Sequence, residues 1–379
     1  MKNIFVLLLT LCGIVGILIY PEVSCDSAEQ AIEMCLTVLV PTLFPFLVLS
    51  GIFIKCGFAE RLGRLLDRFT KKVFCVGGNC SSAMILGLVS GFPVGAKTVS
   101  SLYKNGACSK VEAERTLAFC NNAGPSFILG TVGVGIWQSG KTGWLLWAVQ
   151  IVSAVFVGII VGRIWKGTAD TVVFVNAKNN IPQKQSVLHI FLSSVTDGAV
   201  SMLYICSFVV FFAVAVSLLL HTGLIPSISA AICKLFPFFE RETVENLLVG
   251  IFEMTTGVSR VGNSAPVLQN LAVTSALIGW AGISVHCQVL SYICDGGLSP
   301  KPYFIGKILQ TAFATALIFI CSFLIPGYKA DILPSSEIPQ ISVYALVCGA
   351  VVAFSLTVLF LLLRSKKQTE KTVKFSRKP

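Results

Sequence analysis

Long stretches of apolar, uncharged residues recur along the chain. About 20 such residues in a helix suffice to cross the hydrocarbon core of a bilayer. The stretches that reach this length are residues 3–21, 34–54, 142–162, 198–220, 308–328 and 338–363. We interpret the first as a transmembrane helix rather than a signal peptide, because no small-residue cleavage site follows it. The pattern predicts an all-α, polytopic integral membrane protein.

Two further regions, residues 73–141 and 246–300, are apolar but interrupted by glycine, proline, asparagine and threonine. Helices that break inside a membrane leave backbone groups without partners, and this is tolerated only around a cavity. Counting these regions, we expect roughly 8–10 membrane segments, some of them broken or re-entrant.

The two interrupted regions follow the same order of elements. Each comes after a membrane stretch, a glycine and an amphipathic segment. Aligning Gly87 with Gly250 gives an offset of 163 residues, which also places Lys97 on Arg260. Because the preceding stretches are expected to cross the membrane in opposite directions, we predict two inverted repeats. Inverted repeats with broken helices are typical of secondary transporters.

The pattern divides the chain into six parts. They are a first transmembrane helix with an outer loop (1–30), the first repeat (31–140), a connecting helix with a cytoplasmic loop (141–195), the second repeat (196–300), C-terminal transmembrane helices (301–363) and a basic cytoplasmic tail (364–379).

Composition agrees with a membrane protein. Hydrophobic residues make up 55% of the chain and charged residues 12%, against roughly 25% charged in a soluble domain. Together with a mean hydropathy of +0.82, this excludes a cytosolic enzyme and a disordered chain. The net charge of +11 is explained by lysines and arginines that orient a membrane protein in the bilayer. We therefore expect no nucleic acid partner.

The positions of the cations predict orientation. Lysine and arginine concentrate in residues 55–72, 163–184 and 364–379, whereas 21–30 has no cation and 327–340 has one. Because lysine and arginine collect in short cytoplasmic loops, the first three segments are predicted to be cytoplasmic and the other two external. Both termini are therefore expected in the cytoplasm.

Catalytic and metal-binding motifs are not recognisable. The three histidines lie far apart and no His-Glu-x-x-His occurs. The run from Gly91 to Thr98 lacks the adjacent Gly-Lys of a P-loop. We therefore expect no metal, no cofactor and no enzymatic activity.

The first break is predicted around Gly91, Pro93 and Gly95, because a proline interrupts a helix. The alternative is that glycines at four-residue spacing serve only close helix packing. Ser109 and Glu112 form a capping-box pattern that predicts the start of another helix. A second break is expected where this helix ends.

The second break carries amides that need partners inside a membrane. Its residues are Asn121, Asn122, Gly124 and Pro125. The corresponding place in the other half holds His286 and Gln288, two polar side chains in an apolar stretch. A lone histidine there has two interpretations, a satisfied packing residue or a functional group.

Three motifs together resemble the YlbJ (SpoVV) family of sporulation integral membrane proteins. They are the runs 90–97 (SGFPVGAK), 118–125 (AFCNNAGP) with 127–130 (FILG), and 279–289 (GWAGISVHCQV). The similarity covers about residues 30 to 325. The resemblance implies paired nucleoside-recognition (Gate) domains, so that residues 31–140 and 196–300 are two Gate-like repeats. It also implies transport of dipicolinic acid from mother cell to forespore across the outer forespore membrane.

Dipicolinate is a planar dianion, and a site between inverted repeats would offer it one cation from each half. Under this hypothesis Lys97 and Arg260 bind the two carboxylates. Neutral donors would be Asn121, Asn122, Thr255, Thr256, Ser259, His286 and Gln288. Glu253, seven residues before Arg260, is a candidate for proton coupling or for pairing with that arginine. The alternative is that both cations snorkel to the membrane surfaces.

Other functions fit the same pattern. One is a transporter or channel for nucleosides or other neutral solutes, and another is a membrane protein of spore assembly that transports nothing. The partners expected are a small organic anion, the bilayer and possible further copies of the chain in a homo-oligomer.

Overall fold

The computed structural model describes residues 2–166, 186–237, 239–261 and 267–324. The described residues form helices and connecting segments and contain no strand, which confirms the all-α prediction. By length and composition, five helical runs are suited to crossing a membrane: Pro21–Lys55, Gly140–Ile164, Val187–His221, Val267–Asp295 and Lys301–Phe323. Leu65–Phe74 and Gly78–Ser90 form a further pair that is bent by 91°. The protein is thus a polytopic membrane protein.

The first half of the described chain contains ten helical elements. They are α1 (Lys2–Ile19), α2 (Pro21–Met34), the π-helical η1 (Cys35–Leu39), α3 (Val40–Lys55), α4 (Phe58–Phe74), α5 (Gly78–Ser90), α6 (Val94–Lys104), α7 (Lys110–Leu117), the π-helical η2 (Ser126–Ile136) and α8 (Gly140–Ile164).

The second half of the described chain contains seven helices. They are α9 (Val187–His221), α10 (Leu224–Leu235), α11 (Arg241–Phe252), α12 (Met254–Val261), α13 (Val267–Trp280), α14 (Gly282–Asp295) and α15 (Lys301–Leu324).

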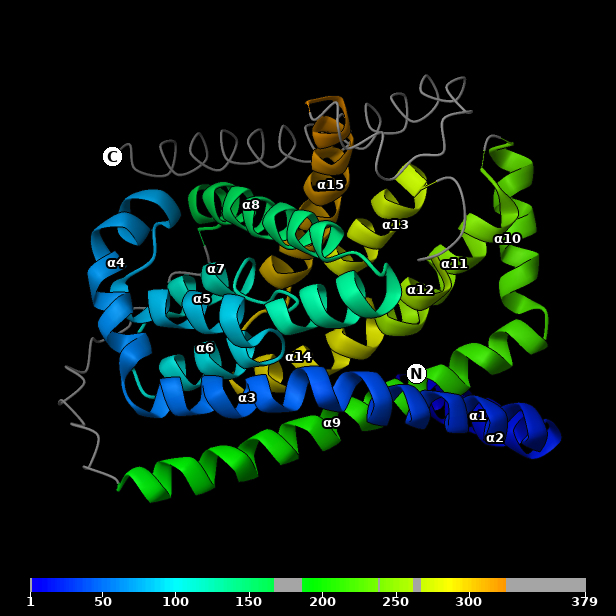
Figure 1. Ribbon diagram of the computed structural model, residues 1–379, viewed down its shortest axis with the longest axis horizontal. Helices are drawn as coiled ribbons and strands as arrows, with labels where there is room; N and C mark the ends of the chain where they lie inside the picture. The colour runs from blue at the N-terminus through cyan, green and yellow to red at the C-terminus, as the bar shows by residue number, and fades with distance from the viewer. Residues whose placement is uncertain (1, 167–185, 238, 262–266, 325–379) are drawn as a thin grey trace, which may run out of the picture.

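The order of elements repeats. From α4 to α8 the chain forms an amphipathic helix, two helix pairs that are each interrupted, and a long helix; α10 to α15 form the same series. Figure 1 shows α4 and α10 at opposite ends of the molecule, with the two interrupted regions between them. This arrangement agrees with the predicted inverted repeats.

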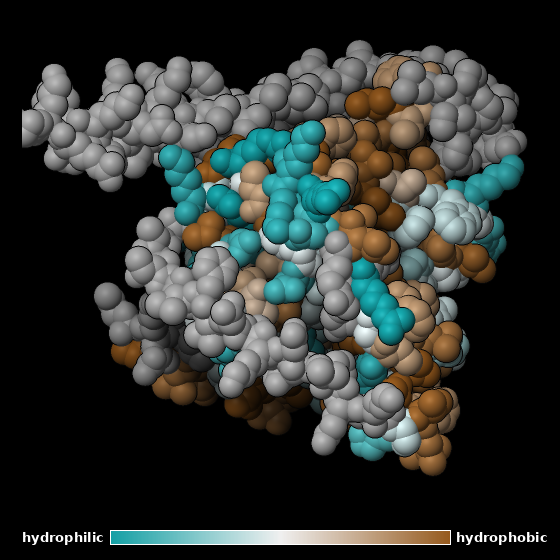
Figure 2. Space-filling view, turned by 90° about the vertical axis from the view of Figure 1, so that its left-hand side faces the viewer, coloured by the Kyte–Doolittle hydropathy of each residue, from teal (hydrophilic) through white to brown (hydrophobic). Residues whose placement is uncertain are grey.

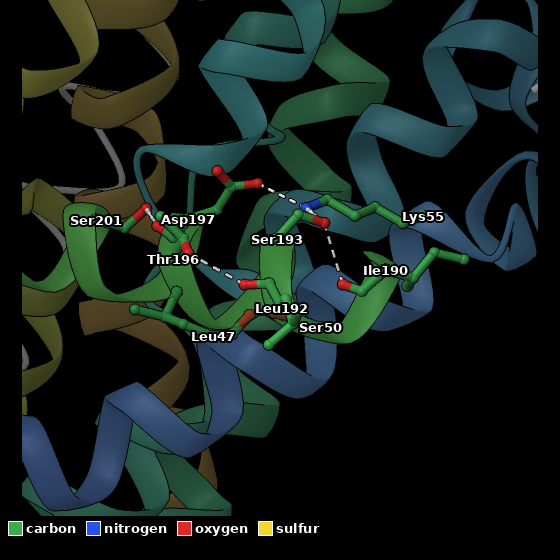
Figure 3. Close-up of polar contacts among 9 residues, drawn as sticks. All are labelled: Leu47, Ser50, Lys55, Ile190, Leu192, Ser193, Thr196, Asp197 and Ser201. Carbon is green, nitrogen blue, oxygen red and sulfur yellow. Dashed lines mark hydrogen bonds and ion pairs between the residues drawn. The ribbon is translucent and has the colours of Figure 1, made fainter. Parts of the chain in front are cut away.

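The long helices α3 and α9 that precede the repeats pack side by side and run antiparallel. The position of Gly51 near the end of α3 contacts Ser194 near the start of α9. Lys55 donates hydrogen bonds of 2.7 Å to Ser193 Oγ and to Asp197 Oδ2, as Figure 3 shows. Antiparallel helices at the head of each half give the two halves opposite directions.

The two basic segments 55–72 and 163–166 lie at one end of the molecule. Arg163 Nη1 donates to the carbonyl of Val73 at 2.8 Å, next to the end of α4. Figure 2 shows this end, where hydrophilic side chains gather near the centre and hydrophobic ones lie above and below. These described parts therefore lie at the same end of the molecule, while residues 167–184 of the second basic segment lie outside the described residues and the cytoplasmic location of both segments stays a prediction.

The structure corrects one element and confirms another. Residues 21–30, expected as an outer loop, belong to α2, because Pro21 at the first position and Glu22 in the first turn favour helix initiation. The capping box of Ser109 and Glu112 forms as predicted. The predicted span 338–363, the loop 327–340 and the tail 364–379 lie outside the described residues.

Candidate functional site

The two breaks of the first repeat contact each other. Helix α5 ends at Ser90 and α6 begins at Val94, and Gly91 between them has φ of 76°, a value that favours glycine. Phe92 N donates to the carbonyl of Asn122 at 2.9 Å, in the non-helical segment after α7. The breaks are thus joined by a backbone hydrogen bond.

Close packing holds this junction. A Cβ on Gly87 would lie 1.6 Å from the carbonyl oxygen of Cys120, and one on Gly95 would lie 2.4 Å from the same atom. The glycines therefore serve close packing, and Gly91 serves the break as well. The predicted break therefore forms, and the alternative that these glycines serve packing alone is wrong.

The breaks of the second repeat also meet. Helices α11 and α12 are separated at Glu253, and α13 and α14 at Ala281. A Cβ on Gly282, which has φ of 79°, would lie 2.9 Å from Met254 N. Glu253 accepts hydrogen bonds from the backbone N–H groups of Thr255 at 3.1 Å and Thr256 at 2.5 Å. A carboxylate at this position stabilises the N-terminus of α12.

All four breaks contribute to one pocket of about 620 Å³, open solvent at its mouth included. Its apolar wall comes from η1, α3 and α9, with Leu39, Leu43, Leu47, Ile205 and Val209. Its polar side chains are those of Ser90, Ser126, Glu253, Thr255, Ser284 and Gln288. A mainly apolar cavity with a few converging polar groups is the usual form of a small-molecule site.

Two of these polar side chains have no hydrogen-bond partner among the described residues. The hydroxyls of Ser90, from the first repeat, and Ser284, from the second, are buried without a hydrogen bond to the described residues. Buried polar groups are normally paired. The pocket thus holds two hydroxyls from opposite halves that are available to hydrogen-bond a polar group.

A buried polar network lies behind the pocket. Gln310 Nε2 on α15 donates to Asn122 Oδ1 at 2.7 Å and to Gln150 Oε1 at 3.1 Å. Lys307 Nζ donates to Gln310 Oε1 at 3.0 Å and lies 5.7 Å from the ring centroid of Phe92. The network joins α15 and α8 to the breaks of the first repeat.

The structure brings five of the sequence-predicted residues into the pocket lining. These are Gly91, Gly124, Glu253, Thr255 and Gln288. Pro93, Gly95 and Pro125 flank the breaks without lining the pocket.

The predicted asparagines hold the break together. Asn121 Oδ1 accepts from Ala96 N at 2.7 Å, and Asn122 Nδ2 donates to Phe119 O at 2.8 Å. Both side chains are buried. The side-chain amides thus form hydrogen bonds with backbone groups of the protein itself, as a buried amide in a membrane requires.

His286 packs against aromatic rings. Its Nδ1 hydrogen-bonds with the hydroxyl of Tyr303 at 2.8 Å, and its ring lies against those of Trp280 and Phe304. Its Nε2 is buried without a partner among the described residues. Thr256 is half-buried and Ser259 is exposed, and neither lines the pocket.

Lys97 and Arg260 are exposed and do not line the pocket. Arg260 Nε donates to Asn246 Oδ1 at 3.0 Å rather than to Glu253. The structure thus does not bring the two cations together, and their role in anion binding stays a prediction.

Sequence reasoning missed Lys307. It stands immediately before the apolar stretch that starts at residue 308, where a lysine reads as an ordinary flanking charge. Gln310 follows three residues later on the same helix face, and this pair of polar residues could have indicated a buried polar contact. The pocket residues Ser90, Phe92, Ser126 and Ser284 were also not singled out as binding residues.

Comparison with known proteins agrees with this architecture. Residues 36–136 match the family model of the Gate domain, described as nucleoside recognition. The chain is 28% identical over 318 residues to the sporulation integral membrane protein YlbJ of Bacillus subtilis (strain 168), covering 79% of this chain and 78% of that protein. No solved structure matches the chain. These comparisons confirm the resemblance that the three motifs indicated: residues 36–136 are similar to the nucleoside-recognition (Gate) family, and the chain is similar over most of its length to the sporulation integral membrane protein YlbJ.

Proposed function

We propose that the protein is a transporter that carries a small solute across a membrane during sporulation. The observation that supports this most is the pocket between the four helix breaks, two from each repeat. Breaks at the interface of inverted repeats are where secondary transporters bind their substrates, because broken helices offer backbone groups and polar side chains near the middle of the membrane. Movement of one repeat against the other would then open the pocket to each side in turn.

Dipicolinic acid is the substrate we propose first. The relative is named as a sporulation protein, and the family resemblance implies this aromatic dicarboxylate. The pocket combines an apolar wall with a few polar side chains, as small-molecule sites do. Its apolar wall suits the ring, and the unpaired hydroxyls of Ser90 and Ser284 suit the carboxylate oxygens. We propose the outer forespore membrane as its location, with both termini in the cytoplasm.

A second candidate is a neutral solute such as a nucleoside. One observation favours it: the carboxylate of Glu253 lines the pocket, while no lysine or arginine among the described residues does. A carboxylate repels a dianion unless a cation or a proton compensates it. Identifying the substrate would therefore distinguish an anion transporter from a transporter of neutral solutes.

Uptake by the purified full-length protein in liposomes tests the proposal. We expect saturable uptake of radiolabelled dipicolinate, and little inhibition by excess uridine. Saturable uptake of radiolabelled uridine with no dipicolinate uptake would favour the nucleoside alternative. Absence of uptake of both would favour a spore-assembly protein.

A strain that lacks the protein supplies the matching test in cells. We expect sporulating cells of this strain to make dipicolinate but to leave it outside the spores. Normal dipicolinate content in those spores would contradict the proposed substrate.

A further inference from the structure

Lys307 is a buried lysine that has no acidic partner among the described residues. Its residue is 1% exposed, and it forms no ion pair with the described residues. An ammonium group has three N–H donors. One of them donates to Gln310 Oε1 at 3.0 Å, and the other two form no hydrogen bond to the described residues. The group therefore has unused capacity to bind an anion.

An aromatic ring that lines the pocket also lies near this ammonium. Lys307 Nζ is 5.7 Å from the ring centroid of Phe92, and Phe92 lines the pocket at the first break. The face of a phenyl ring attracts a cation weakly, by about 0.5–2 kcal/mol. It is a much poorer partner for a buried ammonium than a carboxylate.

The surroundings hold Lys307 in place instead of letting it reach water. Gly306 packs so closely that a Cβ there would lie 2.0 Å from the carbonyl oxygen of Ala118. Gln310, the one hydrogen-bond acceptor of Lys307, is itself fixed by Asn122 and Gln150. Burying a charge without a full set of partners is costly, and an apolar residue would avoid that cost. A carboxylate that entered the pocket would favour the charged form of this amine and supply the partner that it lacks.

We propose that Lys307 binds a carboxylate of an anionic substrate in the pocket, and that the ring of Phe92 covers the ammonium until the substrate enters. This inference rests on the proposed transport function and supplies the cation that the pocket lining lacks. Displacement of the ring exposes the two unused N–H donors to the pocket. The positive charge then offsets Glu253, so that an anion binds despite that carboxylate.

The test compares two ligands of the same shape on the purified full-length protein. Radiolabelled dipicolinate carries two carboxylates, and pyridine-2,6-dimethanol carries two hydroxymethyl groups in their place. For Lys307→Met we expect the Kd of dipicolinate to rise by about tenfold or more, because a carboxylate loses its ionic partner. The Kd of the neutral compound should change by less than about twofold. Lys301→Met, an exposed lysine on the same helix, is the matched control and should behave as wild type.

Two further variants guard against effects of folding. Lys307→Gln keeps a donor for Gln310 but loses the charge, so it should show the same selective loss of dipicolinate binding. Phe92→Leu removes the aromatic cover and keeps Lys307, so dipicolinate binding should persist or strengthen. An unchanged ratio of the two affinities in both Lys307 variants would overturn this inference while leaving dipicolinate transport intact. Failure of the wild type to bind or take up dipicolinate would overturn the proposed substrate and this inference with it.

Discussion

The side-chain amide of Gln310 donates a 2.7 Å hydrogen bond to Oδ1 of Asn122, 188 residues away in the chain. Both residues are buried. The bond connects the last described helix to the second break of the first repeat, and Gln150 and Lys307 share the same amide. A single glutamine thus links the two halves behind the pocket.

Replacing Gln310 with leucine should lower the stability of the folded protein. The substitution leaves Asn122 Oδ1, Gln150 Oε1 and Lys307 Nζ each without this partner, and an unpaired buried polar group costs about 1–3 kcal/mol. Thermal unfolding of the purified protein in detergent measures the effect. Thr315→Val, which removes one hydroxyl from the same helix, serves as the control and should change little. Equal melting temperatures for the two variants would contradict this role of the network.

Alanine at Gly87 should prevent the first break from forming. The new Cβ would lie 1.6 Å from the carbonyl oxygen of Cys120, a distance that forces the backbone to move. Gly13→Ala is the control, since nothing lies within 4 Å of a Cβ at that position. Membrane abundance and size-exclusion profiles are the measurements. A normal yield of monodisperse Gly87→Ala protein would show that the close contact is dispensable.

Glu253→Gln should strengthen binding of an anionic substrate. The substitution removes a negative charge from the pocket lining, and one charge a few ångströms away changes the affinity of a dianion by at least about threefold. Direct binding of radiolabelled dipicolinate gives the Kd. Glu242→Gln removes an exposed charge from α11 and is the control. Weaker dipicolinate binding by Glu253→Gln alone would instead indicate that the carboxylate, through a bound proton or cation, assists the substrate.

Variants of the exposed cations Lys97 and Arg260 test whether these residues or Lys307 bind the anion. If they bind the carboxylates, alanine at either position abolishes dipicolinate transport. Because both side chains are exposed outside the pocket lining, we expect uptake by both variants to stay within about threefold of wild type, while Lys307→Met loses it. Loss of uptake in the alanine variants at normal membrane abundance would support the hypothesis that Lys97 and Arg260 bind the two carboxylates.

Topology can be tested with single cysteines in an otherwise cysteine-free protein. Cys56 joins α3 to α4, and Lys166 follows Arg163, which contacts α4, whereas Glu240 lies between α10 and α11. Figure 1 shows α4 and α10 at opposite ends of the molecule. A membrane-impermeant maleimide added to intact cells should label position 240 and spare positions 56 and 166, which should react after the membrane is opened. Labelling of 56 and 166 from opposite sides would exclude the inverted repeats.

The sequence by itself determined the fold class, the position of the breaks and the family resemblance. Each depends on local information: apolar runs long enough for a membrane, a proline and glycines that interrupt a helix, and motifs of adjacent residues. The capping box at Ser109 and Glu112 was predictable for the same reason, since its hydrogen bonds join residues three apart.

Only the tertiary structure decided which polar residues face the pocket. Lys97 and Arg260 occupy matching places in the two halves, yet both are exposed, because a matching position in the chain does not fix the direction of a side chain. Lys307 looked like a flanking charge, and it is buried because Gly306 lets α15 approach the backbone at Ala118. Such contacts join residues nearly two hundred positions apart, and no local pattern of apolar and polar residues encodes them.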